Sequence, residues 1–307
     1  MNKSTAPHNV ENDRYRGTDE YATMPNSVMP QQHTKIKVFG IVVAATVVSF
    51  LVSVAFNENF RWRIVGEYLF DRNIMIGIAN TLALTAISMV LGTVSGAILA
   101  LMKLSPTKTL RWIAETYVWF FRGIPLLVQL LFWFNLAALF PRVGLVVPAL
   151  GVDASLNTNA VISAFTAAII SLTLHESAYM AEIIRSGILS VGKGQREAAD
   201  ALAMTPVQTM FRIILPQAMR IIIPPTGNQV ISMLKTTSLV SVIALNDLLY
   251  SAQIIYSVNY RVIQLLLVAS IWYIVMVTIL TWFQSKIESH YGKGYVPRKV
   301  RKVHAKR

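Results

Sequence analysis

Residues 186–220 read SGILSVGKGQREAADALAMTPVQTMFRIILPQAMR and connect two strongly apolar runs of the chain. Segment 195–204 is rich in alanine and contains no helix breaker, which predicts a short helix. Residues 205–208, TPVQ, supply an N-cap, a proline at the first helical position and the glutamine of a capping box. A second short helix therefore begins there, and we expect it to end at Pro216. Two such helices form a compact projection that fits a groove on a partner protein.

The chain on both sides of this connection is dominated by apolar blocks. Of its 307 residues, 54% are hydrophobic and only 14% are charged. About 20 apolar residues in a helix cross roughly 30 Å of hydrocarbon, whereas a soluble helical core would show amphipathic stripes. The sequence predicts an all-α integral membrane protein with about six transmembrane helices, at Val38–Phe56, Ile74–Met102, Trp112–Phe140, Val161–Ile184, Met219–Leu245 and Val262–Phe283.

Positive charge is distributed unevenly between alternate connections. The chain has 28 lysines and arginines and a net charge of +13. Most of them lie in the two terminal segments and in the second-to-third and fourth-to-fifth connections. The other three connections hold only Arg61, Arg63, Arg72, Arg142 and Arg261. Because lysine and arginine are retained in cytoplasmic loops, both termini and residues 186–220 are expected in the cytoplasm.

The two ends of the chain differ from its middle. Residues 1–34 are polar without hydrophobic periodicity, which predicts a disordered cytoplasmic tail. Residues 35–60 contain the first span, interpreted as a retained anchor because its apolar run exceeds a usual signal core. Cleavage after Ser53-Val54-Ala55 is the alternative. Residues 286–307 form a basic tail suited to anionic lipid, or a simple topology signal, rather than to nucleic acid, since no nucleic-acid-binding fold accompanies it.

Several motifs occur in a definite order along residues 74–284. The cytoplasmic connection contains Glu197-Ala198-Ala199 and then Ile214-Leu215-Pro216. With these motifs the chain resembles the amino-acid permeases of ATP-binding-cassette importers, of the histidine, glutamine and arginine type. The resemblance implies a type I importer core of five helices over residues 70–285, with the first span as an extra helix. It extends to Arg122-Gly123-Ile124-Pro125-Leu126-Leu127, Ala178-Tyr179-Met180-Ala181-Glu182-Ile183, Gly194-Gln195, Pro216-Gln217-Ala218 and Lys235-Thr236-Thr237-Ser238-Leu239.

The resemblance also implies that the loop around Glu197 is a coupling helix, which docks in a groove on an ATPase subunit. A glutamate near a helix start is favoured by the helix dipole, and small apolar residues beside it allow close approach. Ala203 departs from the glycine usual in the family. If the backbone at this position is left-handed, alanine lowers the stability of the protein by about 1 kcal/mol relative to glycine. The alternative is a helix that continues for one more residue. The residues assigned to coupling are Gln195, Glu197, Ala198, Ala199, Leu202 and Ala203.

Polar residues inside the spans mark candidate positions on a substrate path, because a charge costs roughly 2.5 to 3.5 kcal/mol at the centre of a span. His175, Tyr179 and Glu182 recur on one face of the fourth span, and Glu176 adjoins them. The alternative for Glu182 is an ion pair with Arg185.

The third and fifth spans add further candidates. Arg122 precedes a glycine and a proline that loosen the third span; the alternative is that it reaches the cytoplasmic interface. The fifth span is expected to break at Pro224-Pro225, with Lys235, Thr236 and Ser238 beyond the break. These residues are expected at a dimer axis or on the path, and packing or gating is the alternative for Lys235.

These features predict the permease subunit of an importer that carries a polar amino acid into the cytoplasm across a bacterial inner membrane. No phosphate-binding loop occurs in the sequence, so ATP and Mg²⁺ are expected on a separate subunit, and no cofactor on this chain. With no cysteine and no paired histidines, a membrane enzyme is a poor interpretation. The resemblance implies two ATPase subunits, a second permease copy or paralogue, and a periplasmic substrate-binding protein. The alternatives are cargo such as an opine or amino-acid derivative, or a self-sufficient secondary transporter.

Overall fold

The computed structural model describes residues 34–147 and 152–291, and the chain divides into two units. The first unit, Met1–Phe60, contains helix α1 (Thr34–Phe56) and the short 3₁₀ helix η2 (Glu58–Phe60). Its window Val38–Phe56 is long and apolar enough to cross a membrane, and none of its residues is buried. The predicted tail before Thr34 lies outside the described residues.

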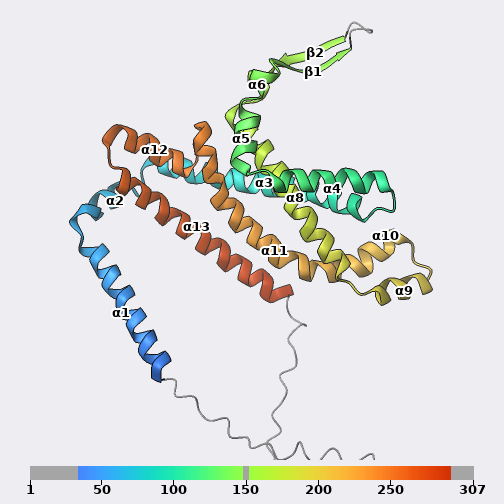
Figure 1. Cartoon of the computed structure of the whole chain (residues 1–307), viewed down its shortest axis with the longest axis horizontal. Helices are drawn as coiled ribbons and strands as arrows, with labels where there is room; N and C mark the ends of the chain where they lie inside the picture. The colour runs from blue at the N-terminus through green and yellow to red at the C-terminus, as the bar shows by residue number, and fades with distance from the viewer. Residues whose placement is uncertain (1–33, 148–151, 292–307) are drawn as a thin grey trace, which may run out of the picture. The chain divides into compact units, whose positions relative to one another are not determined.

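The second unit, Arg61–Arg307, is a bundle of helices with one projecting hairpin (Figure 1). Helices α3, α8, α11 and α13 run alongside one another, and the α9–α10 connection lies at one end of α8 and α11. The elements are α2 (Trp62–Tyr68), α3 (Arg72–Leu104), α4 (Lys108–Gly123), α5 (Leu126–Phe134), α6 (Leu136–Leu139), β1 (Arg142–Val147), β2 (Val152–Asn157), α7 (Thr158–Val161), α8 (Ala164–Leu189), α9 (Lys193–Ala201), α10 (Pro206–Thr209), the π-helical turn η4 (Met210–Ile214), α11 (Leu215–Thr236), the 3₁₀ helix η5 (Thr237–Ile243), α12 (Leu248–Asn259) and α13 (Val262–Tyr291).

Two glycines allow α3 and α8 to approach each other closely. A Cβ atom on Gly92 would lie 2.8 Å from Cβ of Glu176, and one on Gly96 would lie 2.6 Å from Cβ of Met180. Real Cβ contacts are not this short, so no larger residue fits without a shift. Small residues at helix contacts are the usual means of close packing within membranes. This contact fixes the depth at which α8 presents its polar side chains.

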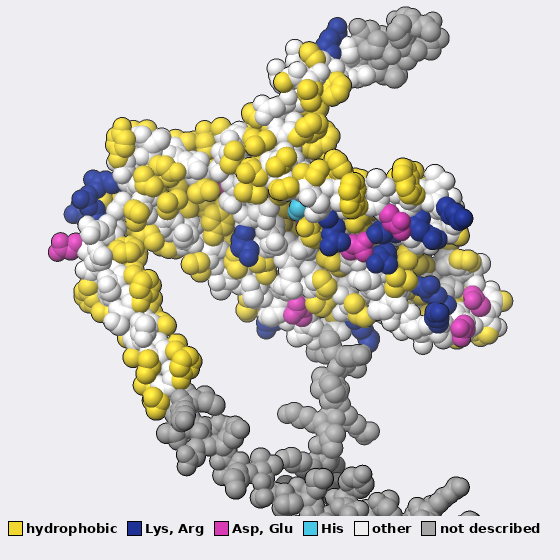
Figure 2. Space-filling view, viewed as in Figure 1, with side chains coloured by type: hydrophobic (Ala, Val, Ile, Leu, Met, Phe, Trp, Pro, Cys, Tyr) yellow, Lys and Arg dark blue, Asp and Glu magenta, His cyan; other side chains and the backbone are white. Residues whose placement is uncertain are grey.

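Three described helices are long and apolar enough to cross a membrane, or up to five spans if each bent pair counts as one. Helix α8 is not among them, because its polar residues lower its hydropathy; many of its residues are buried within the bundle instead. Figure 2 shows hydrophobic side chains over much of the bundle, with basic side chains gathered where α4 begins and around α9 and α10. This arrangement agrees with a multi-pass membrane protein.

The predicted third span is not one straight helix. Helices α4 and α5 meet at 98° across Ile124 and Pro125. Beyond α5, the strands β1 and β2 pair as an antiparallel hairpin, from Arg142 opposite Asn157 to Val147 opposite Val152, which the sequence did not predict. The hairpin projects from the bundle beyond α6 (Figure 1).

The predicted break at Pro224-Pro225 is wrong, because α11 runs through both prolines from Leu215 to Thr236. Each proline removes one backbone donor, but packing against α8 and α13 holds the helix in place. The break occurs after Thr236, where η5 leads to a left-handed Ala244 and then to α12, which is also absent from the sequence prediction.

Helix α3 holds this break in position. The side chain of Asn80 donates to the carbonyl of Asn246 at 2.6 Å, and the backbone N–H of Leu248 donates to the hydroxyl of Thr81 at 3.1 Å. Backbone groups freed by a break inside a membrane must find partners within the protein. Here polar side chains of a neighbouring span supply them.

The end of the chain also differs from its prediction. Helix α13 continues to Tyr291, so the first residues of the predicted tail, from Lys286 onward, are helical. The rest of that tail, residues 292–307, lies outside the described residues.

Candidate functional site

A small polar cavity of about 160 Å³ lies between α8 and α11. It contains four of the eight residues predicted on the substrate path, namely His175, Glu176, Tyr179 and Thr236. The sequence analysis missed the other three, Gln229, Ser232 and Met233. Their spacing along α11 was the available signal: Ser232 and Met233 lie three and four residues after Gln229, and four and three residues before Thr236, which places all four on one helix face.

Glu176 is the most deeply buried ionisable residue of this cavity, with only 3% of its surface exposed. The amide of Gln229 donates to its two carboxylate oxygens at 3.3 and 3.5 Å. Among the described residues, no lysine or arginine forms an ion pair with it. A buried carboxylate without a cationic partner is costly, so it is suited to a ligand that brings the positive charge.

Aromatic rings continue the site toward the break in the third span. The rings of His175 and Tyr179 lie 4.9 Å apart, and the guanidinium of Arg122 lies 5.1 Å from the centre of the Tyr179 ring. Arg122 does not line the cavity and is exposed. It reaches the cavity only indirectly, through a cation–π contact with Tyr179, which lines the cavity.

Gln129, in the first turn of α5, links the break in the third span to the same cavity. Its amide donates to the carbonyls of Phe121 and Ile124 at 3.0 and 2.9 Å, and lies 3.5 Å from Nδ1 of His175. The two carbonyls belong to the end of α4, where the helix leaves them without an intrahelical partner. The sequence analysis missed Gln129, which is only 4% exposed. It therefore holds the bend and also contacts His175, which lines the cavity.

Three predicted path residues lie elsewhere. Glu182 forms ion pairs with Lys103 and Arg185, the latter at 3.0 Å, so the interpretation as a structural ion pair is confirmed. Lys235 is exposed, and the hydroxyl of Ser238 donates to the carbonyl of Lys235. Neither residue lines the cavity. Lys235 therefore does not share the cavity with Glu176, because its side chain lies on another face of α11. Its expected place at a dimer axis stays a prediction.

The connection between α8 and α11 has the two short helices that the sequence predicts. The Thr205 hydroxyl accepts from the N–H of Gln208, whose side chain accepts from the N–H of Thr205, completing the capping box. The expected end at Pro216 is wrong, because α10 continues through η4 directly into α11. A continuous helical segment therefore joins α10 to the helix that carries Gln229.

Ala203 ends the first of these helices in the left-handed region, with φ 52°. The alternative of a longer helix is thus wrong. The N–H of Met204 donates back to the carbonyl of Ala199, as in a helix end closed by a left-handed residue. Alanine at this angle is strained, because its Cβ approaches the following carbonyl oxygen.

Replacing Ala203 with glycine is expected to stabilise the protein by about 1 kcal/mol and to raise its melting temperature by roughly 2 °C. Thermal unfolding of the purified chain in detergent measures this. Ala198→Gly, inside α9, is the control and should destabilise by about 1 kcal/mol. Equal changes of the same sign in both variants would show that the backbone angle of Ala203 carries no strain.

The predicted coupling residues divide into a buried and an exposed set. Ala199 is completely buried and packs inside the chain, so its assignment to an outward apolar face is wrong. Gln195 is exposed and accepts a hydrogen bond from Gln217 at 3.2 Å, which attaches α9 to α11. The outward face instead consists of Glu197, Ala198 and Leu202, the last 74% exposed, with Val207 and Phe211 as exposed apolar side chains on the following segment.

Comparison with known proteins identifies the family. The model described as binding-protein-dependent transport system inner membrane component matches residues 92–293. An arginine transport system permease protein of Corynebacterium glutamicum, ArgU, is 44% identical over 272 residues, which cover 88% of this chain and 84% of the relative. A probable glutamine ABC transporter permease protein of Bacillus subtilis, GlnM, is 35% identical over 222 residues, which cover 72% and 94%.

A solved structure agrees with these sequence relatives. The crystal structure of an amino acid ABC transporter with histidines has a chain 36% identical to this one, with a TM-score of 0.63. The match covers 74% of this chain and 98% of that one. The chain therefore belongs to the inner membrane components of binding-protein-dependent transport systems, and among these to the permease subunits of amino-acid ATP-binding-cassette importers.

Proposed function

We propose that this permease moves an amino acid with a positively charged group into the cytoplasm, and that the cavity between α8 and α11 contacts that group. The observation that carries the proposal is the buried carboxylate of Glu176, which is hydrogen-bonded to Gln229 and has no ion-pair partner among the described residues. A cationic ligand gains a desolvated charge partner there, whereas a neutral sugar gains none. The similarity to a relative named for arginine transport supports the same class of cargo.

The energy source is proposed to be a separate ATPase, which binds ATP and Mg²⁺. Its docking surface on this chain is the outward face of the α9–η4 connection, where Leu202, Val207 and Phe211 are exposed. Exposed large apolar side chains on a cytoplasmic loop are typical anchors for a groove. The complete importer is proposed to contain two ATPase subunits, a second permease copy or paralogue, and a periplasmic substrate-binding protein. The exposed Lys235 is proposed to face the second permease.

Transport by the reconstituted complex tests this proposal. The permease, its ATPase and its binding protein are placed in liposomes, and uptake of labelled arginine, histidine and glutamine is measured with and without ATP. ATP-dependent uptake of a cationic amino acid is expected. Competition by an opine or an amino-acid derivative would show that the permease carries these solutes as well. Uptake driven by an ion gradient without ATP would contradict the proposal and favour a secondary transporter.

The domain limits and topology are also proposed. Residues 70–285 are assigned to the permease domain, 35–60 to an extra anchor, and 1–34 and 286–307 to cytoplasmic tails. Reporter fusions at Lys37 and after Lys293 are both expected to report the cytoplasm, because the basic connections lie on the same side. A periplasmic signal from either fusion, or a mature chain that starts at Phe56, would contradict this topology.

A further inference from the structure

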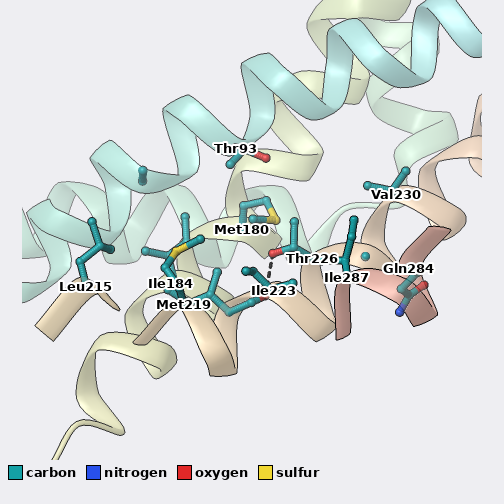
Figure 3. A pocket seen from close by; sticks show the side chains of 13 residues that line it. Thr93, Met180, Ile184, Leu215, Met219, Ile223, Thr226, Val230, Gln284 and Ile287 are labelled. Atoms are coloured by element: carbon teal, nitrogen blue, oxygen red, sulfur yellow. Dashed lines mark hydrogen bonds between the residues drawn. The ribbon is translucent and has the colours of Figure 1, made fainter. Parts of the chain in front are cut away.

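A second and larger cavity, of about 460 Å³, lies between α3, α8, α11 and α13 (Figure 3). Helices α3, α8 and α13 contribute from their C-terminal halves, and α11 contributes along most of its length. Figure 3 shows Met180, Ile184, Met219 and Ile223 around this space, with Thr93 across from them and Gln284 at one end.

The chemistry of this cavity differs from that of the Glu176 site. Its polar side chains are Thr93, Thr226 and Gln284, and the rest of its lining is apolar. The hydroxyl of Thr226 is already engaged, donating to the carbonyl of Ile222 at 2.8 Å, and the amide of Gln284 donates to Glu288 at 2.8 Å. The side-chain oxygen of Gln284 has no partner among the described residues. The rest of the lining offers little to a polar amino acid, so the cavity favours an apolar occupant.

The shape of the cavity suits a chain-like occupant. Its lining follows α11 from Leu215 to Val230, which is about 22 Å at the rise of an α-helix. One leaflet of the hydrocarbon core is roughly 15 Å thick. The cavity is thus long enough to hold an acyl chain that lies along α11 within a single leaflet.

Two basic side chains lie beside the cavity. Arg220 is exposed and lies on the face of α11 that carries Ile223 and Gly227, three and seven residues further on, both of which line the cavity. On α13, Lys286 adjoins the lining residue Ile287 and lies over the Trp282 ring. Basic groups between membrane helices on the cytoplasmic side bind anionic lipid headgroups.

We propose that this cavity binds one acyl chain of an anionic phospholipid, whose phosphate lies beside Arg220. The apolar lining, its length along α11 and the basic side chains beside it together select a ligand that is apolar over its length and negative in its headgroup. This site is separate from the Glu176 cavity, so it does not depend on which amino acid is carried.

Lipid retention by the purified full-length chain tests the proposal. The chain is prepared in detergent with added phosphatidylglycerol or with phosphatidylcholine of the same acyl chains, and bound lipid is counted by native mass spectrometry. The wild type is expected to retain one phosphatidylglycerol about tenfold more tightly than Ala97→Phe, which fills the cavity from α3. Arg220→Gln should lose the preference for phosphatidylglycerol, whereas Lys108→Gln, a basic residue outside the cavity, should keep it.

A second measurement covers the case in which Ala97→Phe fails to fold. The chain has no cysteine, so Ile287→Cys introduces a single thiol into the lining. Phosphatidylglycerol nanodiscs are expected to slow its labelling by a maleimide about tenfold relative to delipidated detergent. The proposal is overturned if Ala97→Phe and Arg220→Gln retain phosphatidylglycerol like the wild type, or if Ile287→Cys cross-links readily to a second copy, since protein would then close the cavity.

Discussion

Uptake of the cognate amino acid is expected to fall by about 100-fold when Glu176 is replaced by glutamine. The change removes the negative charge that faces the cargo but keeps the size of the side chain. A glutamine can still exchange hydrogen bonds with Gln229, which lies 3.3 Å from the carboxylate, so the packing of α8 on α11 is retained. The measurement is initial uptake into liposomes, divided by the amount of assembled complex.

Glu115→Gln is the matched control for this prediction. Glu115 is an exposed glutamate on α4 and does not line the cavity, so its replacement should leave uptake within about twofold. Loss of assembly in Glu176→Gln would point to a structural role for the carboxylate. Full uptake of every cationic amino acid by a normally assembled Glu176→Gln complex would remove Glu176 from the substrate path.

The second large effect is expected in the cytoplasmic connection. Leu202→Arg should weaken binding of the ATPase by about 30-fold and abolish ATP-driven uptake, while the permease still folds and inserts. The reason is that Leu202 is 74% exposed on the proposed docking face, where a charged side chain would enter an apolar groove. Co-purification of the ATPase and uptake are measured together.

Two further variants separate docking from folding. Leu110→Arg makes the same change at an exposed position in the first turn of α4, outside the connection, and should leave ATPase binding unchanged. Ala199→Arg places the charge at a completely buried position, so it should lower the melting temperature as well as uptake. If Leu202→Arg co-purifies with the ATPase as well as the wild type does, this surface is not the docking face.

Local sequence signals predicted the elements that depend on neighbouring residues. The capping box of Thr205 and Gln208 formed as expected, and long apolar runs became α1, α3 and α13. Helix α12 was missed because its 12 residues are too few to cross a membrane, although Asp247 marks its start by accepting a hydrogen bond from the N–H of Tyr250. A search confined to runs of about 20 apolar residues does not find such a helix.

Predictions that concern contacts between distant segments were less successful. Spacing along α8 placed His175, Glu176, Tyr179 and Glu182 on one polar stripe, and the structure brings all but Glu182 to one cavity. On α11 the predicted Thr236 lines the cavity, but Lys235 does not, and Gln229 was missed. Side-chain spacing defines a face of one helix, but not the rotation of the neighbouring helix that meets it.

The sequence by itself determined that this chain is a helical membrane protein, because hydropathy, basic-residue placement and capping act within a few residues of each other. The permease class came from the resemblance of its motifs to a known family. Only the tertiary structure decided where the helices break. Helix α11 continues through Pro224 and Pro225, whereas the chain breaks after Thr236, where Asn80 and Thr81 of α3 satisfy the freed backbone groups. The physical reason is that in an apolar core a break is tolerated only where another segment supplies hydrogen-bond partners, and the sequence of one span does not contain its neighbours.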